Sequence, residues 1–377
     1  MISLPIMGCT DIFKGLKQGW HGIIPKAKVY SGNIAATPNQ TAIDATLLSD
    51  GGLSGIPAAH VLVPFSSFTE TSKKGCAIRP YGDVSDWHHG TENFGNYGCD
   101  FFYSGNYVFH FLSPLMIDSL GRIEATCDEL TPWTFSALGY LDGITDFSTP
   151  LHSGELPTTW TTKDVSVETG GGDILIWMKD TCTGSGVGSM FAVRPTGSGG
   201  LGQWNEPGSS YAGGAASCTG ESIAYGKAAG FMTIAPSSQF DYIGNNADIH
   251  KVTGCWAPAV FCNQTIISGA LPTAWTELDL KVDEAAVSTG LVGEKLACLA
   301  IQCTDNTSSY SFVAVRRKGD PDDYFVGSRK ATAQAASWID KGWVFEFIVP
   351  TSSDGKIEIR MNSGTYSYVV TLLGYSL

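Results

Sequence analysis

The chain has 377 residues, of which 43% are hydrophobic and only 16% charged, so we expect it to bury real cores rather than remain disordered. At about 100–200 residues per domain, this length predicts two to four domains. The net charge of −13 argues against non-specific nucleic-acid binding, which depends on neutralising phosphates. The sequence contains no run of roughly 18 apolar residues, so it does not predict a membrane helix.

The N-terminal segment differs from the remainder in charge. Its first 30 residues hold four lysines and one aspartate, a net +3, which leaves −16 for the rest of the chain. We expect residues 1–35 to form an arm that anchors the protein to an acidic neighbour, with a loosely ordered terminus as the alternative. The candidate anchors are the apolar residues Ile2, Leu4, Ile6, Phe13, Leu16 and Trp20.

Two sequence blocks recur three times. The first is Ala, a β-branched residue, Arg, two variable residues and Gly, at Ala77–Gly82, Ala192–Gly197 and Ala314–Gly319. The second closes each unit on Gly139, Gly254 and Gly374, which follow the arginine of the first block by 60, 60 and 58 positions. This constant spacing predicts a triplicated unit, with copies at 36–145, 146–259 and 260–377.

The segments between these blocks alternate apolar and polar residues with period two, as in Val344–Pro350 and Tyr366–Leu372. Such alternation indicates half-buried strands, and turn residues such as Ser353-Asp-Gly separate them. The sequence therefore predicts an all-β protein of three tandem β-sandwich domains of about 110 residues each. Jelly-roll-like and immunoglobulin-like sandwiches both remain open, and the missing Cys–Trp–Cys pattern favours the jelly roll.

The recurring arginines Arg79, Arg194 and Arg316 are either structural or mark three equivalent ligand sites. In the structural interpretation, which we favour, each arginine lies on the face opposite the alanine of its block. It then pairs with an acid or stacks on an aromatic ring. No other titratable residue is seen to recur among the three units.

Units two and three also open alike, with Leu156-Pro-Thr-Thr-Trp160 and Leu271-Pro-Thr-Ala-Trp275, each followed by an aspartate four residues later. We expect Trp160 and Trp275 to lie in a core or at a domain junction. Exposed tryptophans would instead suit stacking on carbohydrate.

The sequence offers little chemistry. No common catalytic or nucleotide-binding motif is present, and we expect no catalytic residue, metal or cofactor. His88-His89 and Asp320–Asp323 are more typical of polar turns than of metal sites, although clustered carboxylates also suit calcium. The ten cysteines form no CxxC pair and no signal peptide is visible, which predicts free thiols in a reducing cytoplasm, with disulfides as the alternative.

The opening Leu-Pro-Thr-x-Trp-Thr-x-x-Asp and the closing Leu-Gly-Tyr resemble small β-sandwich modules of bacteriophage virion structural proteins. This resemblance implies a head-decoration, head-fibre or tail-appendage component that is assembled in the host cytoplasm. Its partners would be other virion proteins in an oligomeric assembly, and it would contact the host surface. The alternative is a carbohydrate-binding array with a surface glycan as partner, and a hydrolase is a third possibility.

Overall fold

The computed structural model describes residues 19–34, 41–44, 62–68, 76–82, 99–100, 111–117, 120–127, 131–142, 144–146, 152–155, 157–182, 189–198, 215–219, 227–245, 248–304, 311–320, 335–339, 344–361 and 367–377. Most of them form strands, and the helical turns among them are α1 (Ser166–Thr169) and η2 (Pro236–Ser238). No helix in this part of the chain is long and apolar enough to cross a membrane. The protein is therefore all-β, as predicted.

The first eight strands form two antiparallel sheets, which we call the inner and outer sheets of unit 1. The inner sheet runs β1 (Trp20–Ile34), β8 (Thr131–Leu141), β3 (Leu62–Phe68) and β6 (Phe111–Met116). The outer sheet runs β2 (Thr41–Asp44), β7 (Arg122–Cys127), β4 (Cys76–Pro80) and β5 (Cys99–Asp100). Strand order 1-8-3-6 against 2-7-4-5 is that of a jelly roll.

The same order returns twice, in units 2 and 3. In unit 2 the inner sheet has β9 (Thr145–Asp146) and β10 (His152–Glu155) beside β17 (Asp248–Ala270), then β12 (Ile174–Cys182) and β15 (Lys227–Ala235). Its outer sheet has β11 (Thr161–Asp164), β16 (Gln239–Asn245), β13 (Ser189–Pro195) and β14 (Ala215–Thr219). In unit 3 the inner sheet has β17, β24 (Ser367–Ser376), β19 (Leu296–Cys303) and β22 (Val344–Pro350). Its outer sheet has β18 (Thr276–Asp279), β23 (Lys356–Met361), β20 (Ser311–Arg317) and β21 (Ala335–Ile339).

Strand β17 belongs to both units. Up to Pro258 it pairs with β12 of unit 2, and from Ala259 onward it pairs with β24 of unit 3. Pro258, which has no N–H to donate, lies where the pairing changes partner, so no ladder hydrogen bond is lost there. The expected boundary at 259/260 therefore falls inside a continuous strand, and the two inner sheets join into one sheet of eight strands.

The start of unit 1 corrects the predicted arm. Residues 20–34 form β1 and pair with β8, so they belong to the sandwich rather than to an arm. Trp20 is 8% exposed and its backbone N–H donates to the carbonyl oxygen of Leu377 at 3.2 Å, so it does not serve as a free anchor. The other five predicted anchors lie in residues 1–18, outside the described residues.

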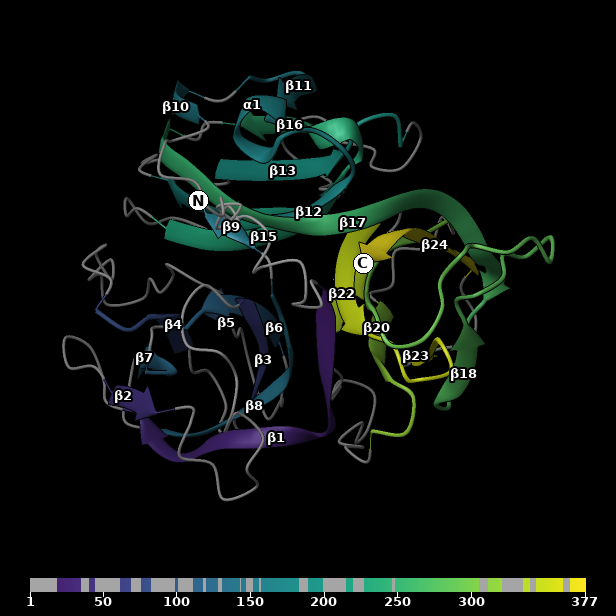
Figure 1. Cartoon of the computed structure of the whole chain (residues 1–377), viewed down its shortest axis with the longest axis horizontal. Coiled ribbons are helices and arrows are strands. Elements are labelled where there is room, and N and C mark those ends of the chain that lie inside the picture. Colours follow the sequence, from purple (N-terminus) through teal and green to yellow (C-terminus); the bar gives the residue numbers. More distant parts are fainter. Residues whose placement is uncertain are drawn as a thin grey trace, which may run out of the picture.

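The three units lie around the end of β24 (Figure 1). The Leu377 N–H donates to Pro258 O at 3.1 Å, which ties this end to the strand shared by units 2 and 3, while Leu377 O binds unit 1. At the edges, β14 of unit 2 contacts β22 of unit 3, and β21 of unit 3 contacts β6 of unit 1. In both cases the fifth strand of one unit meets the sixth strand of another, which is a head-to-tail arrangement.

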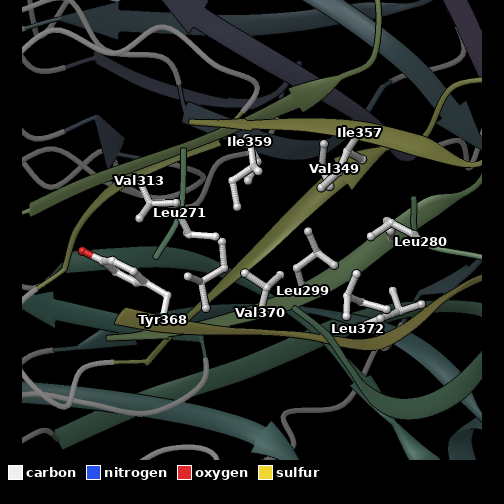
Figure 2. Close-up of a cluster of buried hydrophobic side chains, with 14 of the residues drawn as sticks. Leu271, Leu280, Leu299, Val313, Val349, Ile357, Ile359, Tyr368, Val370 and Leu372 are labelled. Atoms are coloured by element: carbon white, nitrogen blue, oxygen red, sulfur yellow. The ribbon is translucent and has the colours of Figure 1, made fainter. Parts of the chain in front are cut away.

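Unit 3 has a core between its two sheets. Leu299, Val370 and Leu372 from the inner sheet face Ile357 and Ile359 from the outer sheet, and all five are at most 2% exposed (Figure 2). Burying one such side chain stabilises the fold by about 1.5–3 kcal/mol. The period-two pattern that predicted the strands thus places the apolar residues of both sheets in one core.

The closing glycines are explained by a close approach of two strands. A Cβ at Gly374 would lie 2.2 Å from the carbonyl oxygen of Val260, and one at Gly139 would lie 2.4 Å from that of His21. Beside both glycines, the first strand of the unit slips its register against the eighth. In unit 2 the first strand breaks there instead, with β9 ending and β10 beginning on either side of Gly254. Only glycine allows this approach of the backbones.

We predict that Gly374→Ala destabilises the protein by about 3 kcal/mol, because the new methyl group must displace the backbone of β17. Urea denaturation followed by circular dichroism measures the change. Val167→Ala on α1 is the control, since Val167 is 95% exposed and should shift stability by less than about 0.5 kcal/mol. Equal effects of the two substitutions would contradict this account of the closing glycine.

Candidate functional site at the recurring arginines

The recurring arginines lie on the fourth strand of each unit, opposite an acid on the seventh. Arg79 pairs in register with Glu124, Arg194 with Asp241, and Arg316 with Glu358. A carboxylate therefore recurs in all three units, which corrects the expectation that no other titratable residue does. The signal was hidden because unit 2 carries aspartate, within Gln-Phe-Asp, where units 1 and 3 carry Ile-Glu.

In unit 2 the pairing is a compact polar cluster. Arg194 Nε donates to Asp241 Oδ2 at 3.2 Å, and the Cζ atom of Arg194 lies 4.1 Å from the centroid of the Trp160 ring. Thr162 and Thr196 donate to the other oxygen of Asp241, at 2.8 Å and 3.1 Å. Asp241 is 8% exposed, so its charge is compensated by three donors on the outer face of the sheet.

Unit 3 repeats this geometry. Arg316 Nε donates to Glu358 Oε2, and the Arg316 Cζ atom lies 4.1 Å from the centroid of the Trp275 ring. The arginine and glutamate side chains are 10% and 16% exposed. Trp160 and Trp275, which directly precede β11 and β18, thus lie against the arginines of the outer sheets rather than in a core.

Unit 1 lacks the opening tryptophan and uses a different contact. Arg122, at the start of β7, places its Cζ atom 3.6 Å from the centroid of the Tyr81 ring. The Gly82 N–H donates to Glu124 Oε1 at 3.4 Å. An arginine–aromatic contact beside the recurring acid is therefore kept, although the aromatic residue comes from the turn after β4. The side chain of Arg79 lies outside the described residues.

The alanine and the arginine of the repeated block lie on the same face of the strand, which corrects the expectation that they lie on opposite faces. Side chains two positions apart on a strand share a face, so Ala314 lies on the same face as Arg316. The core residues of β20 are Val313 and Val315. The β-branched position of the block, and not the alanine, is therefore the core position.

A network of exposed charges continues the outer face of unit 3. Lys318 Nζ lies 3.0 Å from both Glu277 Oε1 and Asp354 Oδ2, and Lys356 Nζ lies 3.1 Å from Glu277 Oε2. Hydrogen bonds from Ser352 and Lys318 lower the pKa of Asp354 to about 2. Hydrogen bonds from the two lysines also lower the pKa of Glu277.

Asp320 is not the solvated acid that the Asp320–Asp323 turn predicted. Its carboxylate lies 3.3 Å from Arg317 Nη2, and the two side chains are 4% and 1% exposed. Arg317 follows Arg316 on β20 and so points to the opposite face, where units 1 and 2 carry Pro80 and Pro195. Residues 321–323 and His88-His89 lie outside the described residues.

Within the described ranges, no three His, Cys, Asp or Glu side chains come together to hold a metal. Cys262 and Cys298 are free thiols. Burial raises the pKa of Cys262 to about 12, which makes it a poor nucleophile near neutral pH. In units 2 and 3 a carboxylate accepts from the Nε of the arginine, and a tryptophan ring covers the face of the guanidinium. This geometry favours a structural role for these arginines.

No family model and no curated protein matches the sequence. Solved structures that match include a chain from the structure described as "The Triple Jelly Roll Fold and Turret Assembly in an Archaeal Virus", at 9% identity and a TM-score of 0.20, covering 95% of this chain and 89% of that chain. Another is from the structure of Sulfolobus Turreted Icosahedral Virus, at 10% identity and a TM-score of 0.20, covering 96% and 89%. At these scores neither likeness supports an inference about this chain, whose jelly-roll order stands on its own strand pairing.

We predict that Trp275 and Arg316 stabilise the fold together. A double-mutant cycle of Trp275→Ala and Arg316→Ala should give a coupling energy of about 1 kcal/mol in urea denaturation, as expected for a largely desolvated cation–π pair. Arg316→Lys should recover only part of the loss, because an ammonium keeps the charge without the planar stack. Additive single effects would show that the contact does not contribute to stability.

The lowered pKa of Asp354 predicts a loss of stability in acid. Its carboxylate stabilises the folded chain fully above its ordinary pKa of 3.8, and this contribution disappears as the pH falls toward about 2. Asp354→Asn should therefore lose less stability than the wild type between about pH 5 and pH 2.5 in urea denaturation. Glu168→Gln on exposed α1 is the control. A parallel decline in Asp354→Asn and the wild type would contradict the role of this carboxylate.

Proposed function

We propose that this chain is a non-enzymatic structural protein of a virus particle. The observation that carries the proposal is the closed arrangement of three jelly rolls, joined by a shared strand and by backbone hydrogen bonds at Leu377. Jelly rolls are a recurrent architecture of viral capsid proteins and of lectins. A chain that holds three of them as one body is suited to cover a surface or to project from it.

The electrostatics agree with such a role. The body is acidic, while residues 1–18 hold Lys14 and Lys17 against the single acid Asp11. A basic and apolar segment ahead of an acidic body suits attachment to another virion protein. We propose that this segment anchors the chain and that the three units decorate or project from a particle, where they are available to contact a host.

The carbohydrate-binding alternative has less support. Trp160 and Trp275, the tryptophans that recur at equivalent positions, each have a ring face against an arginine. A sugar stacking on that face would have to displace the guanidinium. A glycan array with the full chain tests this alternative directly, and binding abolished by Trp160→Ala or Trp275→Ala would favour it.

The proposal predicts that the protein copurifies with particles at a fixed stoichiometry, measured by quantitative mass spectrometry across a density gradient. Deleting residues 1–18 should release it from the particles and leave β1 and the fold intact, as circular dichroism would show. A deletion through residue 34 is not suitable, because it removes β1. Recovery of the full chain only in the particle-free fractions would contradict the proposed function.

A further inference from the structure

Units 2 and 3 begin the loop between their second and third strands in the same way. Asp164 and Asp279 end those second strands, and each carboxylate accepts a hydrogen bond from the N–H two residues later. The next residue, Val165 or Leu280, is fully buried, and its N–H donates to a carbonyl in the turn between the sixth and seventh strands. The two loops therefore leave the outer sheet through the same local structure.

This local structure presents a valine to solvent in both units. Val167 and Val282 are each the third residue after the aspartate, and they are 95% and 41% exposed. In unit 3, Val287 lies next to the backbone bridge between Val282 and Ser288 and is 54% exposed. We call residues 164–170 and 279–290 the valine turns. One exposed apolar residue is ordinary, but its recurrence at the same position of two units indicates a surface that is covered in use.

Both valine turns are held by hydrogen bonds of their own. In unit 2, Thr169 Oγ1 donates to the carbonyl oxygen of Val165 at 2.9 Å. In unit 3, Asp283 Oδ1 accepts from the N–H groups of Ala285 and Val287, at 2.9 Å and 2.8 Å. A turn that is ordered before it meets a partner loses little conformational entropy on binding. The exposed valines are therefore presented in a form suited to recognition.

The charge around the valines selects the kind of partner. Residues 164–170 hold two acids and no base, and residues 279–290 hold three acids and one lysine, so each valine turn carries −2. A nucleic acid, an anionic membrane and a second copy of this chain, whose net charge is −13, all carry charge of the same sign. The complementary surface is an apolar pocket bordered by lysine or arginine.

On the basis of the proposed function, we propose that the valine turns of units 2 and 3 dock into a neighbouring virion protein with apolar pockets bordered by basic residues. Figure 1 shows α1, within the valine turn of unit 2, and β18, directly before that of unit 3, on different sides of the end of β24. Two separate contacts fix the orientation of the body on the particle. The second contact also forms at a high effective concentration once the first is made.

Competition for places on the particle tests the docking. The wild type and the double variant Val167→Ser and Val282→Ser are produced in the same cells during assembly. Mass spectrometry of their distinct peptides compares their ratio in purified particles with that in the soluble fraction. The double variant should be incorporated about tenfold less than the wild type, because two apolar contacts are lost. Val167→Ser alone should be incorporated about threefold less, and misfolding cannot explain that loss because Val167 is 95% exposed.

Leu120→Ser is the matched control for this competition. Leu120 is 59% exposed in the turn before β7 of unit 1, outside the valine turns, and its variant should be incorporated like the wild type. Equal incorporation of the double variant and the wild type would overturn the docking and leave the proposed function standing. Particles that lack the wild type would instead contradict the proposed function.

Cross-linking identifies the occupant. On intact particles, a carbodiimide should join Glu168, which is exposed beside Val167, to a lysine of a different virion protein. Particles assembled from an equal mixture of ¹⁵N-labelled and unlabelled copies of this chain distinguish the alternative. Linked peptides from Glu168 that combine one labelled and one unlabelled copy would make a second copy the occupant, which would overturn the proposal.

Discussion

The arrangement of the molecule depends on one continuous backbone ladder, that of β17. This strand supplies the eighth strand of unit 2 and the first strand of unit 3, so two cores are built on one 23-residue segment. Asp173 of unit 2 reinforces the junction, because its carbonyl accepts from the Ala259 N–H and its carboxylate accepts from the Phe261 N–H, both at 3.1 Å. Units 2 and 3 therefore cannot rotate about a linker as tandem domains commonly do.

The connection between units 1 and 3 is made without a shared strand. Unit 1 reaches unit 3 through the Trp20 hydrogen bond to Leu377 and through the edge contact of β6 with β21. A head-to-tail contact between similar units forms a ring when the rotation closes and a filament when it does not. Here one chain supplies all three units, and the described residues show two such edge contacts, β14 with β22 and β21 with β6. These contacts cover strand edges that an isolated sandwich would leave open for aggregation.

The sequence predicted what depends on local pattern and missed what depends on pairing between distant strands. Alternating apolar residues and the constant spacing to Gly374 predicted the strands and the sandwich. The recurrence of Asp241 with Glu124 and Glu358 was missed because only the register against the arginine strand aligns them. The extent of the arm was misjudged for the same reason: the residues of β8 that pair with β1 lie 97 to 121 positions further along the chain.

The loop between the second and third strands of each unit begins alike in units 2 and 3 but differs between them in length. In units 2 and 3 this loop starts alike, with Asp164 Oδ1 accepting from the Ser166 N–H at 2.8 Å and Asp279 Oδ1 accepting from the Lys281 N–H at 2.9 Å. Nine residues then lead from β11 to β12, against sixteen from β18 to β19. The longer loop brings Glu294 to β1 of unit 1, where its Oε2 would lie 2.5 Å from a Cβ at Gly22. Since the sheets, the arginine clusters and the closing glycines serve the fold, a length difference at this loop gives unit 3 a surface that unit 2 lacks.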